Sequence, residues 1–139
     1  MGPTDSLRRQ HDELLEVATK IAALLNPEAI EQKAEEIASL LAKLAGKLKM
    51  HLAMEDKSLY PKMISSTDTT TKDLAEKFIA EMGEISSVFS QYMNDWSSPT
   101  AMRADPKGFI KVTTDLFGAV KKRIDRENGQ LYPQLEATY

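Results

Sequence analysis

Five polar residues stand where the helical spacing of this sequence calls for a hydrophobic side chain: His11, His51, Glu55, Arg123 and Glu127. Burying such groups costs several kcal/mol unless they are paired with one another or bound to a metal ion. Two imidazoles and two carboxylates suit iron, zinc or manganese, and a carboxylate can bridge two metal ions. The residue types therefore predict either a metal site or a metal-free polar core in which Arg123 pairs with the two carboxylates.

The spacing of these residues reveals an internal repeat. Residues 51–61 align without a gap with residues 123–133, so that His51 matches Arg123, Glu55 matches Glu127, and both segments end in Leu-Tyr-Pro. A separation of four residues puts the two members of each pair on one face of a helix. The first helical segment aligns with the third at an offset of 71, which matches His11 to Met82. The repeat predicts two similar helical hairpins whose special positions meet at the centre.

Four amphipathic segments must position these residues. The chain has 139 residues, of which 42% are hydrophobic and 28% charged, with six Gly and six Pro. This composition is typical of a globular protein with long helices. Apolar residues recur in steps of three and four over residues 5–25, 26–63, 72–96 and 105–133, with loops at 65–71 and 97–104. We therefore expect an all-α fold, an antiparallel up-down-up-down four-helix bundle that forms one domain over residues 1–139.

Counting residues from the predicted connections between helices places His51, Met82 and Arg123 at one height in the bundle, within about one helical turn. The connection between the first two helices, at Asn26, fits less well. His51 lies 25 residues after Asn26, whereas His11 lies only 15 residues before it. Residues 26–36 must therefore overhang the bundle, kink or form a separate short helix. The sequence leaves these three possibilities open.

Charge and composition exclude several classes of protein. A net charge of −3 disfavours binding to nucleic acid or to an anionic membrane surface. No apolar run approaches the ~18 residues of a membrane span. The absence of cysteine excludes thiolate metal sites and fits a reducing compartment, so we expect a cytoplasmic protein. The oligomeric state is left open by the sequence.

The sequence resembles the hemerythrin-like HHE cation-binding domains. The shared features are a His in the first helix, His-x-x-x-Glu followed by Leu-Tyr-Pro in the second, and a repeat of that motif in the fourth. The resemblance extends over residues 7–135. Members of this family are four-helix bundles that hold two non-haem irons bridged by two carboxylates, and many bind or sense dioxygen.

The resemblance implies that half of a di-iron site is retained. His11, His51, Glu55 and Glu127 fall on ligand positions, whereas Met82 and Arg123 stand where the third and fourth helices of the family offer a His. A thioether is a poor ligand for iron, and a guanidinium is none. We therefore expect one metal ion at most, iron or alternatively zinc or manganese, with dioxygen as a candidate ligand. We also predict that Arg123 contacts Glu127, Glu55 or both, and so supplies the charge of the missing metal.

Two functions follow from this interpretation. The first is a non-enzymatic metal-binding protein that responds to oxygen or redox state; the alternative is a metal-free scaffold or partner-binding bundle. We favour metal binding, because a core that had lost its metal would not be expected to keep all four ligand residues at matching positions. A ferritin-type oxidase needs Glu-x-x-His on two helices, but Arg8 and Leu48 occupy those Glu positions. We therefore expect no catalytic residues, and we expect the repeated tyrosines, Tyr60 and Tyr132, to pack the end of the bundle.

Overall fold

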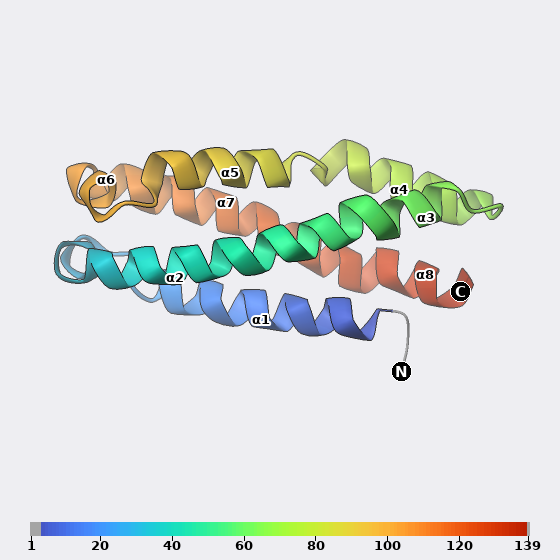
Figure 1. Ribbon diagram of the computed structural model, residues 1–139, viewed down its shortest axis with the longest axis horizontal. Helices are drawn as coiled ribbons and strands as arrows, with labels where there is room; N and C mark the ends of the chain where they lie inside the picture. Colours follow the sequence, from blue (N-terminus) through green and yellow to red (C-terminus); the bar gives the residue numbers. More distant parts are fainter. Residues whose placement is uncertain (1–3, 139) are drawn as a thin grey trace.

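The apolar stripes of the sequence form helices in the computed structural model, which describes residues 4–138. Two long helices, α1 (Asp5–Ala22) and α2 (Pro27–Met54), are followed by α4 (Thr69–Met82), α5 (Ile85–Trp96) and α7 (Pro106–Arg126). Figure 1 shows an elongated bundle in which the chain runs back and forth along one axis. The prediction of an all-α bundle is confirmed.

Side-chain caps determine where two of the long helices begin. Asn26 accepts a hydrogen bond from the backbone N–H of Ala29 (2.8 Å), and Asp105 accepts one from Gly108 (3.0 Å). In both cases a proline follows directly, where its missing N–H costs nothing. The predicted starts of α2 and α7 are therefore confirmed.

The same kind of cap corrects both predicted loops. Asp68 accepts from the N–H of Thr70, so α4 begins at Thr69 and not at residue 72. Ser98 accepts from Ala101 N–H (3.1 Å) and starts a short helix, α6 (Pro99–Ala104), inside the segment predicted as a loop. The prediction of a loop over residues 97–104 is wrong, because Ser98-Pro99 repeats the cap-then-proline pattern.

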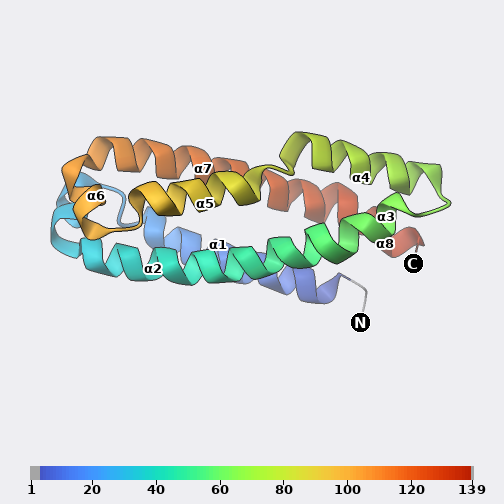
Figure 2. The same cartoon turned by 45° about the horizontal axis from the view of Figure 1, so that its top comes forward.

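A kink accommodates the extra length of the second predicted helix. Residues 27–54 stay helical, but Lys33 has non-helical backbone angles (φ −129°, ψ 25°). Helix α6 lies beside this part of α2, at the end of the bundle where α2 begins (Figure 2). There Arg103 donates to the carbonyl of Glu31 and to both carboxylate oxygens of Glu35. Of the three possibilities for residues 26–36, the structure shows the kink.

The third predicted helix is interrupted, contrary to the expectation of one helix over residues 72–96. Helix α4 ends at Met82 and α5 begins at Ile85, with a thin link between them in Figure 1. A Cβ at Gly83 would lie only 2.6 Å from the carbonyl oxygen of Ile79, so glycine alone fits without a backbone shift. The last carbonyls of a helix lack partners within it. The interruption therefore makes the Met82 carbonyl available to another group.

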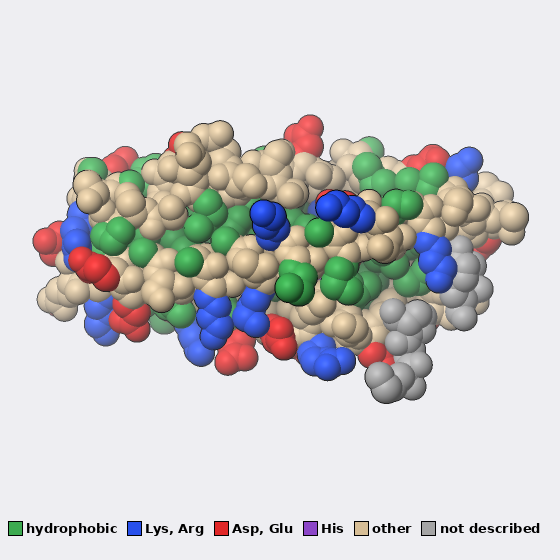
Figure 3. Space-filling model, viewed as in Figure 1, with side chains coloured by type: hydrophobic (Ala, Val, Ile, Leu, Met, Phe, Trp, Pro, Cys, Tyr) green, Lys and Arg blue, Asp and Glu red, His purple; other side chains and the backbone are tan. Residues whose placement is uncertain are grey.

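The core follows the predicted stripes, and charged side chains cover the outside. Fully buried apolar side chains come from α1, α2, α4 and α7, among them Ile21, Ile37, Leu41, Phe78 and Phe109. No histidine is visible on the face shown in Figure 3, whose charged groups lie between and around apolar seams. Within residues 4–138, no helix combines the length and the apolar character needed to cross a membrane.

We predict opposite effects for two Gly→Ala substitutions. Gly83→Ala should lower the free energy of unfolding by about 1–3 kcal/mol, because the added methyl group meets backbone. Gly46→Ala is the control: Gly46 is exposed within α2, nothing lies within 4 Å of an added Cβ, and the change should stabilise by about 0.5–1 kcal/mol. Urea unfolding of both variants measures the difference, and stabilisation by Gly83→Ala would contradict the close contact.

Candidate metal centre

Two π-helical turns mark the centre of the bundle, one in each half of the sequence repeat. The first, Glu55–Leu59, joins α2 to α3 (Tyr60–Ile64), and the second, Glu127–Leu131, joins α7 to α8 (Tyr132–Thr138). Such turns insert a residue into an α-helix and are often found at functional sites. The sequence repeat is therefore also a structural repeat, and each turn starts at a carboxylate of the cluster. The second turn lies inside the segment predicted to be helical over residues 105–133, and the chain stays helical through Gly129 and Pro133.

The structure brings all four predicted ligand residues together. One ligand atom from each of His11, His51, Glu55 and Glu127 can be chosen so that all four lie within 4.8 Å of one another. His11 Nε2 is 3.0 Å from Glu127 Oε1, and His51 Nε2 is 3.1 Å from Glu55 Oε1. None of these side chains is more than 2% exposed. The cluster is thus a closed, water-poor site deep in the helical core.

The far nitrogen of each imidazole is held by a side-chain amide. His11 Nδ1 lies 2.9 Å from Asn128 Oδ1, and His51 Nδ1 lies 2.7 Å from Gln10 Oε1. An amide oxygen can only accept, so Nδ1 carries the proton in both rings. This arrangement turns both Nε2 atoms toward the centre, as metal-binding histidines require. His51 Nε2 is buried and lies 3.1 Å from Glu55 Oε1, but it makes no well-aligned hydrogen bond with any described residue.

Arg123 contacts both carboxylates, as predicted. Its Nε donates to Glu127 Oε2 and its Nη2 to Glu55 Oε1, each at 3.2 Å, while Nη2 also lies 3.4 Å from the half-exposed Asp56. The remaining Nη1 donates to the Met82 carbonyl (3.2 Å), which the interruption after α4 makes available. Met82 therefore contributes its backbone to this network.

Both repeated tyrosines belong to the site, which the expectation that they pack the end of the bundle did not include. The Tyr60 hydroxyl donates to Glu127 Oε2 (2.8 Å), and that of Tyr132 donates to Glu55 Oε2 (2.7 Å). Each tyrosine thus serves the carboxylate of the other half of the repeat. The sequence signal was present, since each tyrosine follows a cluster carboxylate by five residues. A regular helix would not bring position five back to the site, whereas a π-turn does. Gln10 and Asn128 were also missed, although each adjoins a ligand in sequence.

The charges of the cluster are unbalanced. Two carboxylates face one permanent cation, Arg123, so ionised carboxylates and neutral imidazoles would leave one excess negative charge. Burial disfavours charge on His51, but the carboxylates of Glu127 and Glu55 close to its ring outweigh that penalty and raise its pKa to about 9. Burial chiefly raises the pKa of Glu55, whereas His11, His51 and Arg123 overcome burial and hold the pKa of Glu127 well below its usual range. The site therefore favours one further positive charge at the imidazoles.

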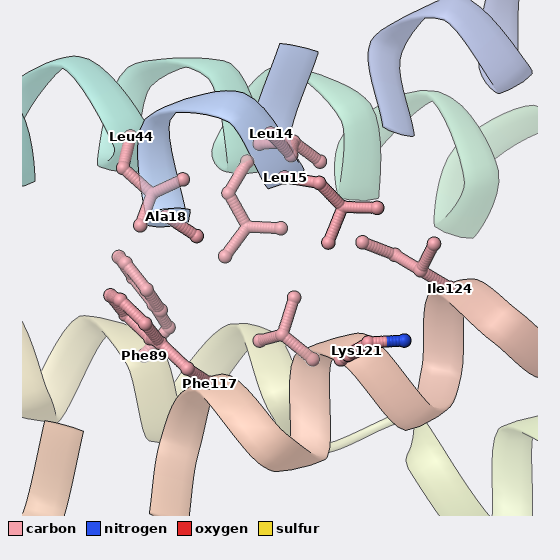
Figure 4. Close-up of a pocket in the computed structure, with 10 residues that line it drawn as sticks. Leu14, Leu15, Ala18, Leu44, Phe89, Phe117, Lys121 and Ile124 are labelled. Atoms are coloured by element: carbon pink, nitrogen blue, oxygen red, sulfur yellow. The ribbon is translucent and has the colours of Figure 1, made fainter. Parts of the chain in front are cut away.

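A small, partly open and mostly apolar cavity lies one helical turn from the cluster. Its volume is about 20 Å³, and its lining includes Leu14, Leu48 and Ile124 together with Phe89 and Phe117 (Figure 4). The first three residues lie one helical turn from His11, His51 and Glu127, respectively. An apolar cavity of this size has room for about one small molecule and offers water no hydrogen bonds.

Comparison with known proteins identifies one family. The family described as Hemerythrin HHE cation binding domain matches residues 2–135, nearly the whole sequence. No curated protein and no solved structure gave a significant match. The match covers α1 through most of α8, and so includes every residue of the cluster.

We predict that Arg123→Leu lowers the free energy of unfolding by about 3–5 kcal/mol, because two buried carboxylates lose their fixed cation. Urea unfolding of metal-free protein, followed by circular dichroism, measures the loss. Lys122→Leu is the matched control, since this neighbour in α7 is exposed and its replacement should change stability by less than about 0.5 kcal/mol. An equally small effect for Arg123→Leu would show that the cluster does not depend on the guanidinium.

Proposed function

This chain belongs to the hemerythrin HHE cation-binding domain family, and we propose that it binds a single metal ion, iron by preference, on His11, His51, Glu55 and Glu127. The observation that carries the proposal is His51 Nε2, a buried nitrogen aimed at two carboxylates without a hydrogen bond of its own. Leaving a buried polar atom without a hydrogen bond is costly. A metal ion at this position would bind that nitrogen directly.

The cluster has the dimensions of a one-ion site. Metal–ligand distances of about 2.1 Å place opposite ligand atoms about 4.2 Å apart. The observed spread of 4.8 Å is only slightly larger, so small side-chain rotations would close it. The Nδ1 bonds to Asn128 and Gln10 already fix both rings in the required orientation.

Arg123 supports the proposal that only half of a two-metal site is retained. Its guanidinium bridges Glu55 and Glu127 and is only 3% exposed. It shares Glu55 Oε1 with His51, whereas at Glu127 it contacts Oε2 and leaves Oε1 to His11. A second cation in the same place would meet a fixed positive charge. It would also find no imidazole ligand, because the two positions are occupied by Met82 and Arg123 instead of histidine. The guanidinium thus supplies the charge that a second metal would otherwise supply.

The donor set is compatible with iron. Two imidazoles and two carboxylates suit first-row metals, with zinc and manganese as alternatives, and four protein ligands leave open positions on a six-coordinate ion. A bound iron would supply redox chemistry and an open position for a small ligand. Tyr60, Tyr132 and Arg123 would hold the carboxylates by hydrogen bonds while Glu55 and Glu127 bind the ion.

We extend the proposal to dioxygen as the small ligand, in a non-enzymatic, oxygen- or redox-responsive protein. The support is the apolar cavity one turn from the cluster, since an apolar space excludes water and admits a small apolar gas. The lack of cysteine fits a reducing cytoplasm, in which ferrous iron would be the form encountered.

One alternative, a metal-free scaffold, has an observation in its favour. His11 and Arg123 already make ion pairs with Glu127, and Arg123 also pairs with Glu55, so much of the cluster is satisfied without metal. The two functions predict different effects of a chelator on the melting temperature. A chelator should lower the melting temperature of a protein that is stabilised by a bound ion, and it should not change that of a metal-free scaffold.

Anaerobic loading with ferrous iron should give one bound ion per chain, measured by elemental analysis after excess metal is removed. The melting temperature should rise, because an ion that binds only the folded state stabilises it. His51→Gln should abolish both effects, whereas Lys49→Gln, an exposed position of α2, should preserve them.

Each other result of this loading experiment has a defined meaning. No bound metal, with a melting temperature indifferent to chelator, would establish the metal-free scaffold in place of our proposal. Two ions per chain would contradict the half-site. Exposing the loaded protein to air should change its visible absorption, and an unchanged spectrum would overturn the dioxygen extension alone.

Restoring the two altered positions provides a gain-of-function test. The double variant Met82→His, Arg123→His should bind two ions per chain, because it replaces the guanidinium and the thioether with imidazoles. The single variant Met82→His is the control and should still bind one, since Arg123 remains between the carboxylates. A folded double variant that binds only one ion would refute the proposed role of Arg123.

A further inference from the structure

A short chain of contacts connects solvent to the ring of His51. Met54 Sδ accepts a hydrogen bond from Gln10 Nε2 at 3.3 Å, and Gln10 Oε1 accepts one from His51 Nδ1–H at 2.7 Å. Met54 is 40% exposed, whereas His51 is almost completely buried. One amide group thus touches an accessible thioether with one end and a proposed ligand with the other.

We propose that Met54 is an oxidation site through which peroxide-class oxidants weaken metal binding at His51. The metal part of this inference rests on the proposed function. The contact between Met54, Gln10 and His51 does not, because the structure shows it directly.

The chemistry at Met54 requires only hydrogen peroxide as co-reactant. The sulfur attacks one peroxide oxygen, an S–O bond forms and the O–O bond breaks. The departing hydroxide takes the proton from the transferred oxygen, which leaves methionine sulfoxide and water. Sulfur loses two electrons and the peroxide gains them. The product is a polar group on a side chain that was apolar.

The sulfoxide changes what Gln10 can contact. Its oxygen is a far better acceptor than a thioether sulfur, and it projects beyond the sulfur by a full bond length. To donate to it, the Gln10 amide must move away from Met54, and the 2.7 Å contact with His51 Nδ1 is lost or bent. Loss of such an outer partner typically reduces metal affinity 10–100-fold.

Met50 provides an internal control on the same helix. It lies one turn before Met54 in α2 and is 65% exposed, so it is at least as accessible to peroxide. Its sulfur has no hydrogen bond among the described residues. Met63 and Met102 are fully buried, Met82 is nearly so, and Met93 is half-buried. Mild oxidation should therefore modify Met50 and Met54 first, and only Met54 should affect His51.

The test treats the wild type, Met54→Leu and Met50→Leu with hydrogen peroxide, and peptide mass spectrometry measures sulfoxide at each methionine. In metal-free protein, oxidation should shift the imidazole ¹⁵N resonances of His51 in the wild type and in Met50→Leu, but not in Met54→Leu. Ferrous affinity should fall 10–100-fold in the first two proteins and stay unchanged in the third.

Three results would overturn this inference: a Met54 that resists oxidation while Met50 is modified, His51 resonances unchanged by Met54 sulfoxide, or equal loss of affinity in Met54→Leu. Failure of the proposed function is distinguishable, because it appears as a lack of metal binding before any oxidation. In that case the ¹⁵N resonances alone decide whether oxidation of Met54 changes the environment of His51.

Discussion

Two buried carboxylates close to each other are the feature on which this structure depends. Glu55 and Glu127 lie in the core of a helical bundle, where an uncompensated charge is far more costly than in water. Both side chains are satisfied by groups from several segments: imidazoles, phenol hydroxyls and one guanidinium. Much of the irregular backbone near the centre can be understood as a means of bringing those groups to the carboxylates.

The two halves of the repeat share a backbone but differ in chemistry. Each half has a π-turn that starts at its carboxylate and ends at a tyrosine donating to the opposite carboxylate. At the equivalent positions before these turns, however, one half has His51 and the other Arg123. The guanidinium is longer than an imidazole and has more donors, so it also reaches the Met82 carbonyl. A repeated scaffold therefore carries an asymmetric site, with both imidazoles in the first half of the sequence repeat and a fixed cation in the second.

The surroundings of the cluster determine what could reach it. Apolar side chains one turn away line a small cavity, whereas the side of Gln10 and Met54 leads through polar contacts to solvent. These two surroundings differ in chemistry, because the first suits a small apolar molecule and the second would transmit a change in hydrogen bonding.

The sequence by itself determined the all-α bundle, the caps at Asn26 and Asp105, and the meeting of His11, His51, Glu55 and Glu127 with Arg123. These features follow from local spacing and residue type, because a polar residue on an apolar stripe must find a partner in the core. Only the tertiary structure decided the π-turns, the interruption at Gly83 and the partners of Tyr60, Tyr132, Gln10 and Asn128. The physical reason is that helical periodicity averages over many residues. The position of a single inserted residue, or of a single missing helical hydrogen bond, depends instead on the side chains that other segments bring close to the backbone.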